Sequence, residues 1–199
     1  DPDYLYVENA SLISTFNNQD YSQLYSEHYF QMSPLSIATV AKSFGYSVLR
    51  LEEFEIHNGS FGILLHKGEK QAKLPLVEIS SDALRISIEQ WASSVRDFWL
   101  TLSQRNKKIM VWGCSAKFLF TYSALDLAEI CPVSYIVDST PEKWGLYAPG
   151  TSVMVCAEED ISELAENLVF VIGARNFEKH ITQKILKIYP SADIHCPPF

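Results

Sequence analysis

The residues most able to do chemistry in the first part of the chain are a tyrosine, a glutamate and a histidine within residues 25–28. A histidine side chain exchanges protons near neutral pH, and a neighbouring carboxylate increases its basicity. His28, supported by Tyr25 and Glu27, is therefore a candidate base that takes a proton from a carbon or hydroxyl of a substrate. The same side chains also suit a solvated or structural loop, and their spacing alone does not separate the two interpretations.

A second polar group follows the apolar run at residues 109–112. Gly113 ends this run and Ser115 begins a helical pattern, which predicts a turn from a strand into a helix. The first amides of a helix lack partners within it and carry partial positive charge, so a phosphate can bind there, and Lys117 would add a full charge. The turn lacks the complete G-x-G-x-x-G pattern. A tight turn without any ligand therefore remains the alternative.

Asp138 ends the next apolar run. In dinucleotide-binding folds a carboxylate at this place accepts hydrogen bonds from a ribose. The alternative role is a cap for the turn over residues 139–141, which reads Ser-Thr-Pro.

The elements that must position these residues alternate between strands and helices from residue 80 to the C-terminus. Such alternation predicts a Rossmann-like, doubly wound α/β domain with a mostly parallel sheet, in which ligands gather beyond the carboxyl ends of the strands. The expected strands are 109–112, 133–137, 153–156, 168–172 and 193–195. The expected helices are 84–102, 115–128, 161–166 and 177–188.

The first part of the chain predicts fewer elements. A strand is expected at 4–7, and a helix over 35–44 follows Ser33 and Pro34 and stops at Gly45. Apolar stretches at 46–56 and 60–66 flank an Asn-Gly turn, which predicts an antiparallel hairpin. A polar break at 68–73 separates the parts, so we expect two domains, residues 1–72 and residues 73–199.

The composition of the chain narrows the range of possible binding partners. The net charge of −8 over 199 residues disfavours nucleic acid. No apolar run reaches the ~20 residues of a membrane span, and no leader opens the sequence. Four cysteines without C-x-x-C spacing fit reduced thiols of a cytoplasmic protein and give no support for a metal site.

Several of these segments occur together, in this order, in one family. The chain resembles the C-terminal portion of SAM-dependent sugar-nucleotide C-methyltransferases, whose linking segment contains Tyr-His-Glu-His, a helix, a strand and His-Gly-Gly-Ser. The family's C-terminal domain carries a Tyr-Gly-Ala-x-Ala-Lys turn, a Val-Asp-x-x-Pro-x-Lys-x-Gly-x-x-x-Pro-Gly-Thr stretch and a late Trp-Asn-Phe. The counterparts here are residues 25–28, 33–45, 46–56, 57–60, 112–117, 137–151 and 175–177.

The resemblance implies that residues 73–199 help to hold a nucleotide-diphosphosugar. The diphosphate would lie near the Gly113 turn, with Ser115, Lys117, Asp138 and Asn176 as further substrate contacts. It also implies that His28, with Tyr25 or Glu27 in support, matches the base that removes a proton from the sugar carbon to be methylated. The methyl donor of the complete enzyme would be SAM.

This sequence departs from the family pattern in several places. The zinc-binding module and the SAM-binding half with its glycine-rich loop are not in this sequence, so we expect no SAM binding and no activity from this chain alone. Residues 1–68 would supply the fifth, sixth and seventh strands of the methyltransferase sheet in the order 5-7-6. Ser26 replaces a histidine of the motif, and Gly62 stands where members usually carry an arginine.

The edge of the fifth strand would then lie open, for the missing N-terminal half or a second copy of the chain. The sequence also leaves two alternative functions open. One is a non-catalytic, Rossmann-like module that binds a partner protein through this edge. The other is an NAD(P)-dependent sugar enzyme in which Asp138 holds a ribose.

Overall fold

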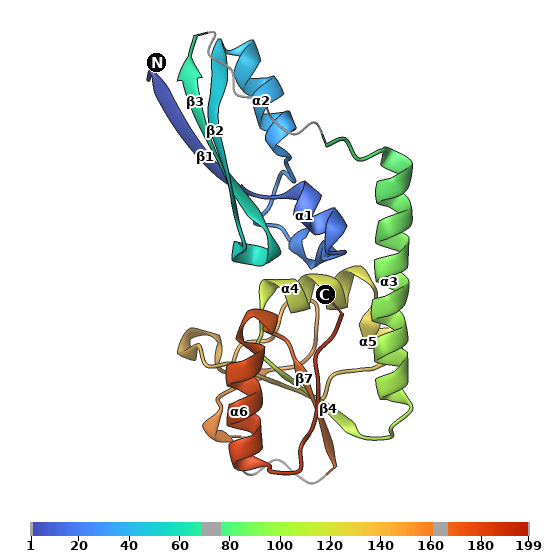
Figure 1. The fold of residues 1–199 in the computed structure, drawn as a ribbon. Coiled ribbons are helices and arrows are strands. Elements are labelled where there is room, and N and C mark those ends of the chain that lie inside the picture. Colours follow the sequence, from blue (N-terminus) through green and yellow to red (C-terminus); the bar gives the residue numbers. More distant parts are fainter. Residues whose placement is uncertain (1, 69–76, 161–166, 199) are drawn as a thin grey trace. The chain divides into compact units, whose positions relative to one another are not determined.

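The computed structural model describes residues 2–68, 77–160 and 167–198 (Figure 1). The chain forms two compact units, Asp1–Gln90 and Trp91–Phe199. The domain boundary predicted at 72/73 lies outside the described residues, as does the helix predicted over 161–166. The two units divide within α3 (Ser81–Ser103).

The first unit contains a three-stranded antiparallel sheet in the order β1-β3-β2. This is the predicted 5-7-6 arrangement, with β3 in the centre. The predicted hairpin is formed by β2 and β3, which a short 3₁₀ helix connects. The elements of this unit are β1 (Tyr4–Ala10), α1 (Leu12–Asn17), η1 (Tyr21–Gln23), α2 (Pro34–Ser43), β2 (Tyr46–Phe54), η2 (Ile56–Asn58) and β3 (Ser60–Lys67).

The core of this unit lies between α2 and one face of the sheet. Ser33 caps α2 by accepting the N–H of Ser36, and Gly45 ends the helix with a φ of +79°. Both features follow from the sequence, because proline suits the first helical turn and glycine tolerates a positive φ. The buried side chains that form this core are Ile37, Ala41, Tyr46, Val48, Phe61, Ile63 and Leu65.

The second unit contains a five-stranded, fully parallel sheet in the order β6-β5-β4-β7-β8. This is the doubly wound topology that the strand–helix alternation predicts. The elements are β4 (Lys108–Trp112), α4 (Ala116–Ala124), α5 (Leu127–Ile130), β5 (Tyr135–Val137), η3 (Pro141–Lys143), β6 (Val155–Cys156), β7 (Leu168–Ile172), η5 (Arg175–Phe177), α6 (Glu178–Ile188) and β8 (Asp193–His195).

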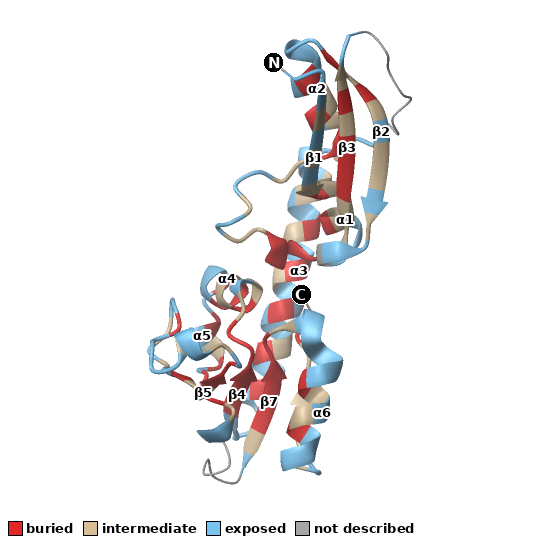
Figure 2. Cartoon of the chain, turned by 90° about the vertical axis from the view of Figure 1, so that its left-hand side faces the viewer, coloured by how far each residue is buried: buried red, intermediate tan, exposed pale blue. Residues whose placement is uncertain are grey.

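Helices cover both faces of this sheet. Figure 1 shows α6 on one side of the strands and α3 on the other, and Figure 2 shows that the central strands β4 and β7 are almost entirely buried. Ile181 and Ile185 of α6 pack against Met110 and Trp112 of β4. Such burial on both faces explains why these strands read as unbroken apolar runs.

The strands predicted over 133–137 and 153–156 are shorter in the structure, and one predicted helix is divided. The helix expected over 115–128 is two helices, because Asp126 adopts a left-handed conformation with a φ of +50° between α4 and α5. The four cysteines are free thiols. In the described part of the chain, no helix is both long and apolar enough to cross a membrane.

Candidate functional site

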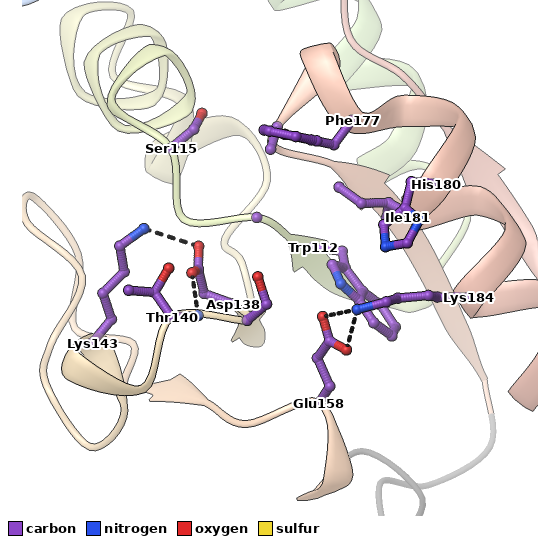
Figure 3. A pocket seen from close by; sticks show the side chains of 13 residues that line it. Trp112, Ser115, Asp138, Thr140, Lys143, Glu158, Phe177, His180, Ile181 and Lys184 are labelled. Atoms are coloured by element: carbon purple, nitrogen blue, oxygen red, sulfur yellow. Dashed lines mark hydrogen bonds and ion pairs between the residues drawn. The ribbon is translucent and has the colours of Figure 1, made fainter.

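The second unit has a cavity of about 350 Å³ at the carboxyl end of its parallel sheet (Figure 3). The strand order reverses between β4 and β7, and ligands of doubly wound sheets bind at such a switch point. The volume lies within the ~300–1,000 Å³ usual for small-molecule sites. The residues that line the cavity are Trp112, Gly113, Ser115, Asp138, Ser139, Thr140, Lys143, Glu158, Ala174, Phe177, His180, Ile181 and Lys184.

Two glycines allow the chain to turn where β4 and β7 end. Gly113 has a φ of +102°, and a Cβ added there would lie 2.6 Å from the Cβ of Ala174. A Cβ added at Gly173 would lie 2.1 Å from the carbonyl oxygen of Gly113. The two strand ends therefore approach more closely than any side chain permits, and this forms the floor of the cavity.

The amides of the turn after β4 are largely occupied by protein acceptors. Cys114 donates its N–H to the carboxylate of Asp138 at 2.7 Å, and Gly113 donates its N–H to the carbonyl of Val137 at 2.7 Å. Ser115 caps α4 by accepting the N–H of Phe118 at 3.2 Å, and its hydroxyl donates to the carbonyl of Gly173. A phosphate at this turn would have to compete with Asp138 for the Cys114 amide.

Asp138 holds this turn together with Lys143. The ammonium of Lys143 donates to the carbonyl of Cys114 at 2.9 Å and to the Asp138 carboxylate at 3.1 Å, while Thr140 donates its N–H to the same carboxylate. Burial raises the pKa of Asp138, but the hydrogen bonds from Thr140, Lys143 and Cys114 outweigh it and hold the pKa below its ordinary value. Asp138 is therefore a charged anchor whose oxygens already have several donors.

The opposite wall of the cavity comes from α6 and the segment after β6. Lys184 donates to both carboxylate oxygens of Glu158, at 2.6 and 2.9 Å. His180 lies one helical turn before Lys184 on the same wall, and the ring of Phe177 borders the cavity above them (Figure 3). Phe177 is 63% exposed, so an aromatic face is available for a flat ligand. The cavity thus combines two lysines and an imidazole with a hydrophobic edge.

The first unit contains the tyrosine–histidine pair that the sequence singles out. The Tyr25 hydroxyl lies 3.3 Å from His28 Nε2, and the two rings stack with their centroids 4.4 Å apart. His28 Nδ1 lies 2.9 Å from the carbonyl oxygen of Gln23. A carbonyl only accepts hydrogen bonds, so Nδ1 carries the proton and Nε2 presents its lone pair toward Tyr25.

The surroundings of Tyr25 disfavour the loss of its hydroxyl proton. Burial first, and then the negative charges of Glu27 and Asp20, raise the pKa of the Tyr25 hydroxyl. A protonated phenol can donate to His28 Nε2, and Glu27, although exposed, therefore supports the pair through its charge. Asp20 is buried and accepts a hydrogen bond from Asn58 at 3.2 Å, which links this loop to the hairpin connection.

One comparison with known proteins finds a family match. Residues 57–192 match the family described as C-methyltransferase C-terminal domain, which covers more than half of the chain. The chain belongs to this family. A search of curated proteins finds no match.

Three of the five substrate contacts predicted for this member of the C-methyltransferase C-terminal domain family lie at the cavity. Gly113, Ser115 and Asp138 line the cavity. Lys117 is the second residue of α4, and Asn176 is exposed in η5; neither is among the lining residues. The substrate roles of all five residues stay predictions.

Sequence reasoning missed four charged or ionisable residues of the cavity: Lys143, Glu158, His180 and Lys184. Lys143 had a signal, because it is part of the 137–151 stretch on which the resemblance to the C-methyltransferases rests. Glu158 follows a two-residue strand, and His180 and Lys184 share a helix face one turn apart. No local motif marks these three, because only the fold brings them to one opening.

The structure also explains one departure from the C-methyltransferase pattern. The resemblance implies an arginine in place of Gly62, and a Cβ at this position would lie 2.1 Å from the Tyr6 hydroxyl and 2.7 Å from its ring carbon. The Tyr6 side chain therefore lies over β3 in the space that a longer residue would need. Its hydroxyl donates to Glu52 at 3.4 Å.

A metal site has no support in residues 2–68, 77–160 and 167–198. Within these ranges no group of three or more histidine, cysteine, aspartate or glutamate side chains is arranged to hold a metal ion. Cys114 is buried beside Asp138, and burial raises the pKa of its thiol, which disfavours the thiolate that a metal would bind.

Proposed function

We propose that this chain is the C-terminal part of a sugar-nucleotide C-methyltransferase and that its cavity binds a nucleotide-diphosphosugar. The observation that carries the proposal is the cavity at the switch point of the parallel sheet, lined by Lys143, His180 and Lys184. Phosphate oxygens accept charge-assisted hydrogen bonds from such groups. Family membership supports the class of enzyme.

The diphosphate is assigned to the Lys184 side of the cavity. Lys143 is held by the carbonyl of Cys114 and by Asp138, so it acts mainly by fixing the turn. Lys184 and His180 project from α6 into the opening, where a ligand oxygen can reach them (Figure 3). The ring of Phe177 would pack against the base or the sugar.

The tyrosine–histidine pair is assigned the proton transfer. The carbonyl of Gln23 fixes the protonated Nδ1 of His28, which leaves Nε2 to take a proton from the sugar carbon beside a carbonyl group. Tyr25 donates to Nε2 in the resting state and must release it when substrate arrives. Burial, Glu27 and Asp20 raise the pKa of Tyr25, which favours its role as a hydrogen-bond donor.

We expect no SAM binding by the first unit. A SAM nucleoside needs a glycine-rich turn between a strand and a helix, whereas the glycines of the first unit lie at the end of α2, at the hairpin and within or after β3. The four free thiols favour a reducing compartment, which for this proposal is the cytoplasm.

Calorimetry with nucleotide-diphosphosugars tests the proposal. UDP-glucose and dTDP-glucose should bind the intact chain, and Lys184→Gln should weaken binding about tenfold through loss of a charge-assisted contact. Lys187→Gln removes the same charge from an exposed position on α6 and should leave the affinity unchanged. A folded protein that binds neither compound would refute the assignment of the cavity.

A second candidate function, a module that binds a partner protein, is favoured by the position of β1. This strand lies at the edge of its sheet. The carbonyl of Asp3 accepts the N–H of Lys67, so Tyr4, Tyr6 and Glu8 direct their backbone groups away from β3. Light scattering of the purified chain tests this function: an assembly that dissociates in Tyr6→Pro would favour it, and a monomer at high concentration would count against it.

A further inference from the structure

The ion pair between Glu158 and Lys184 lies within the candidate cavity. The Lys184 ammonium is 2.6 and 2.9 Å from the two carboxylate oxygens, so the carboxylate occupies the position that an anionic ligand would take on this lysine. Both side chains are partly exposed, at 21% for Glu158 and 36% for Lys184. The pair is therefore open to exchange with a dissolved anion.

The two lysines of the cavity differ in how they are held. Lys143 contacts a backbone carbonyl as well as Asp138, and Asp138 in turn holds the N–H groups of Cys114 and Thr140. Displacing the partner of Lys143 would therefore disturb the turn. Glu158 makes no such backbone contact in the part of the chain that the structure describes, so it can move away without that cost.

We propose that Glu158 competes with the ligand for Lys184 and thereby sets how tightly the cavity binds anions. A diphosphate carries more than one negative charge and several acceptor oxygens, so it can replace a single carboxylate on the ammonium. Every ligand that uses Lys184 must first displace Glu158, so the ion pair weakens the binding of anions at this cavity. Glu158 is in this way a residue that limits the affinity of the cavity for its ligand. The inference deepens the proposed function and rests on the same cavity.

The displaced carboxylate also contributes after the ligand has bound. Glu158 remains on the segment that follows β6, near the phosphate it has made way for, and like charges at short range repel. This repulsion lowers affinity below what Lys184 and His180 alone would give. Removing the charge of Glu158 should therefore strengthen the binding of anions, which is the opposite of what loss of a ligand-contacting residue does.

Calorimetry with inorganic pyrophosphate and UDP-glucose tests the inference on the intact chain. Glu158→Gln should lower the dissociation constant of pyrophosphate about five- to tenfold, because the neutral amide competes less for Lys184. Glu159→Gln removes the same charge from the exposed neighbour, which does not line the cavity, and should change the constant less than twofold. In a double variant that combines Glu158→Gln with Lys184→Gln, this gain in pyrophosphate affinity should be lost.

The outcomes separate this inference from the proposed function. Stronger pyrophosphate binding by Glu158→Gln without binding of UDP-glucose supports competition by Glu158 and refutes the nucleotide-sugar assignment. Binding of UDP-glucose that Glu158→Gln leaves unchanged or weakens overturns the inference alone. Absence of pyrophosphate binding in both proteins also overturns it. If Glu158→Gln does not fold, Glu158→Asp, whose shorter side chain reaches Lys184 less well, should strengthen binding in the same direction.

Discussion

The carboxylate of Asp138 accepts the amide hydrogen of Cys114 at 2.7 Å, which ties the end of β5 to the turn between β4 and α4. Lys143, five residues after Asp138, donates to the carbonyl oxygen of Cys114. The residues that follow β5 thus hold the peptide groups on both sides of Cys114. The indole of Trp144 completes the arrangement by donating to the carbonyl of Asp138 at 2.7 Å.

Asp138→Asn should destabilise the second unit by about 1–3 kcal/mol, because it leaves buried hydrogen-bond donors without an acceptor. The amide group of asparagine has one acceptor oxygen, so the N–H groups of Cys114 and Thr140 and the ammonium of Lys143 would compete for it. Urea unfolding at pH 7 measures the loss. Asp126→Asn is the control, because Asp126 is exposed, makes no capping hydrogen bond and has a φ of +50° that asparagine tolerates. Equal effects of the two substitutions would contradict the role of Asp138.

The stability of the protein should fall in acid below about pH 4, the ordinary aspartate pKa. Burial raises the pKa of Asp193, but hydrogen bonds from Arg105 and His195 outweigh it and lower the pKa, as the bonds to Asp138 do for that residue. A lowered pKa means that the unfolded chain binds protons first as the pH falls. These groups therefore contribute their full stability above the unfolded pKa and lose it as the pH passes down through the folded pKa.

Urea unfolding at a series of pH values between 2 and 7 measures this dependence. Asp138→Asn and Asp193→Asn should each make the acid limb of the curve less steep, since each removes one group that takes up a proton on unfolding. Glu142→Gln, at a position where the side chain is exposed, should leave the slope as it is in the unmodified protein. An acid limb of the same slope in all variants would show that other carboxyl groups cause the loss.

Gly173→Ala should cost the second unit about 3 kcal/mol or more, because the added methyl group meets tightly packed atoms where the two central strands end. It would lie 2.1 Å from the carbonyl oxygen of Gly113 and 2.7 Å from Val111, so β4 and β7 would have to separate. Gly145→Ala is the comparison, with a φ of +73° and no atom within 4 Å of the new Cβ. Its cost should be about 1–2 kcal/mol of backbone strain alone. Thermal unfolding ranks the two, and the reverse order would refute the steric explanation.

Much of the fold could be read from the sequence where local signals agree. The caps at Ser33 and Ser115, the glycine that ends α2 and the apolar runs of β4 and β7 all specify the same elements that the structure has. The break between α4 and α5 could not be read, because residues 115–128 keep an apolar spacing of three and four residues. The left-handed Asp126 that divides them leaves this spacing almost unchanged.

The candidate site was harder to predict than the fold, for a physical reason. Gly113, Ser115 and Asp138 lie at strand ends, which the topology brings together, so their place at the cavity follows from the strand assignment. Lys184 reaches the cavity from the second turn of a helix, and Glu158 reaches it from a loop, so their meeting depends on tertiary packing. The hydrogen bond from the Thr140 N–H to Asp138 is the turn cap that the sequence offered as the alternative role of this residue. The bond from the Cys114 N–H joins two segments far apart in the sequence, so no local pattern marks it.

The neutral imidazole of His28 should carry its proton on Nδ1, because that nitrogen faces the carbonyl oxygen of Gln23 at 2.9 Å. A carbonyl cannot donate, so the opposite tautomer would place two acceptors against each other, whereas Nε2 can accept from the Tyr25 hydroxyl at 3.3 Å. Long-range ¹H–¹⁵N correlation spectra of the protein at mildly alkaline pH identify the protonated nitrogen. Tyr25→Phe should leave the tautomer unchanged, since the Gln23 carbonyl is untouched. A spectrum with the proton on Nε2 would remove the lone pair that the proposed base needs, and with it the assignment of His28 as the residue that takes a proton from substrate.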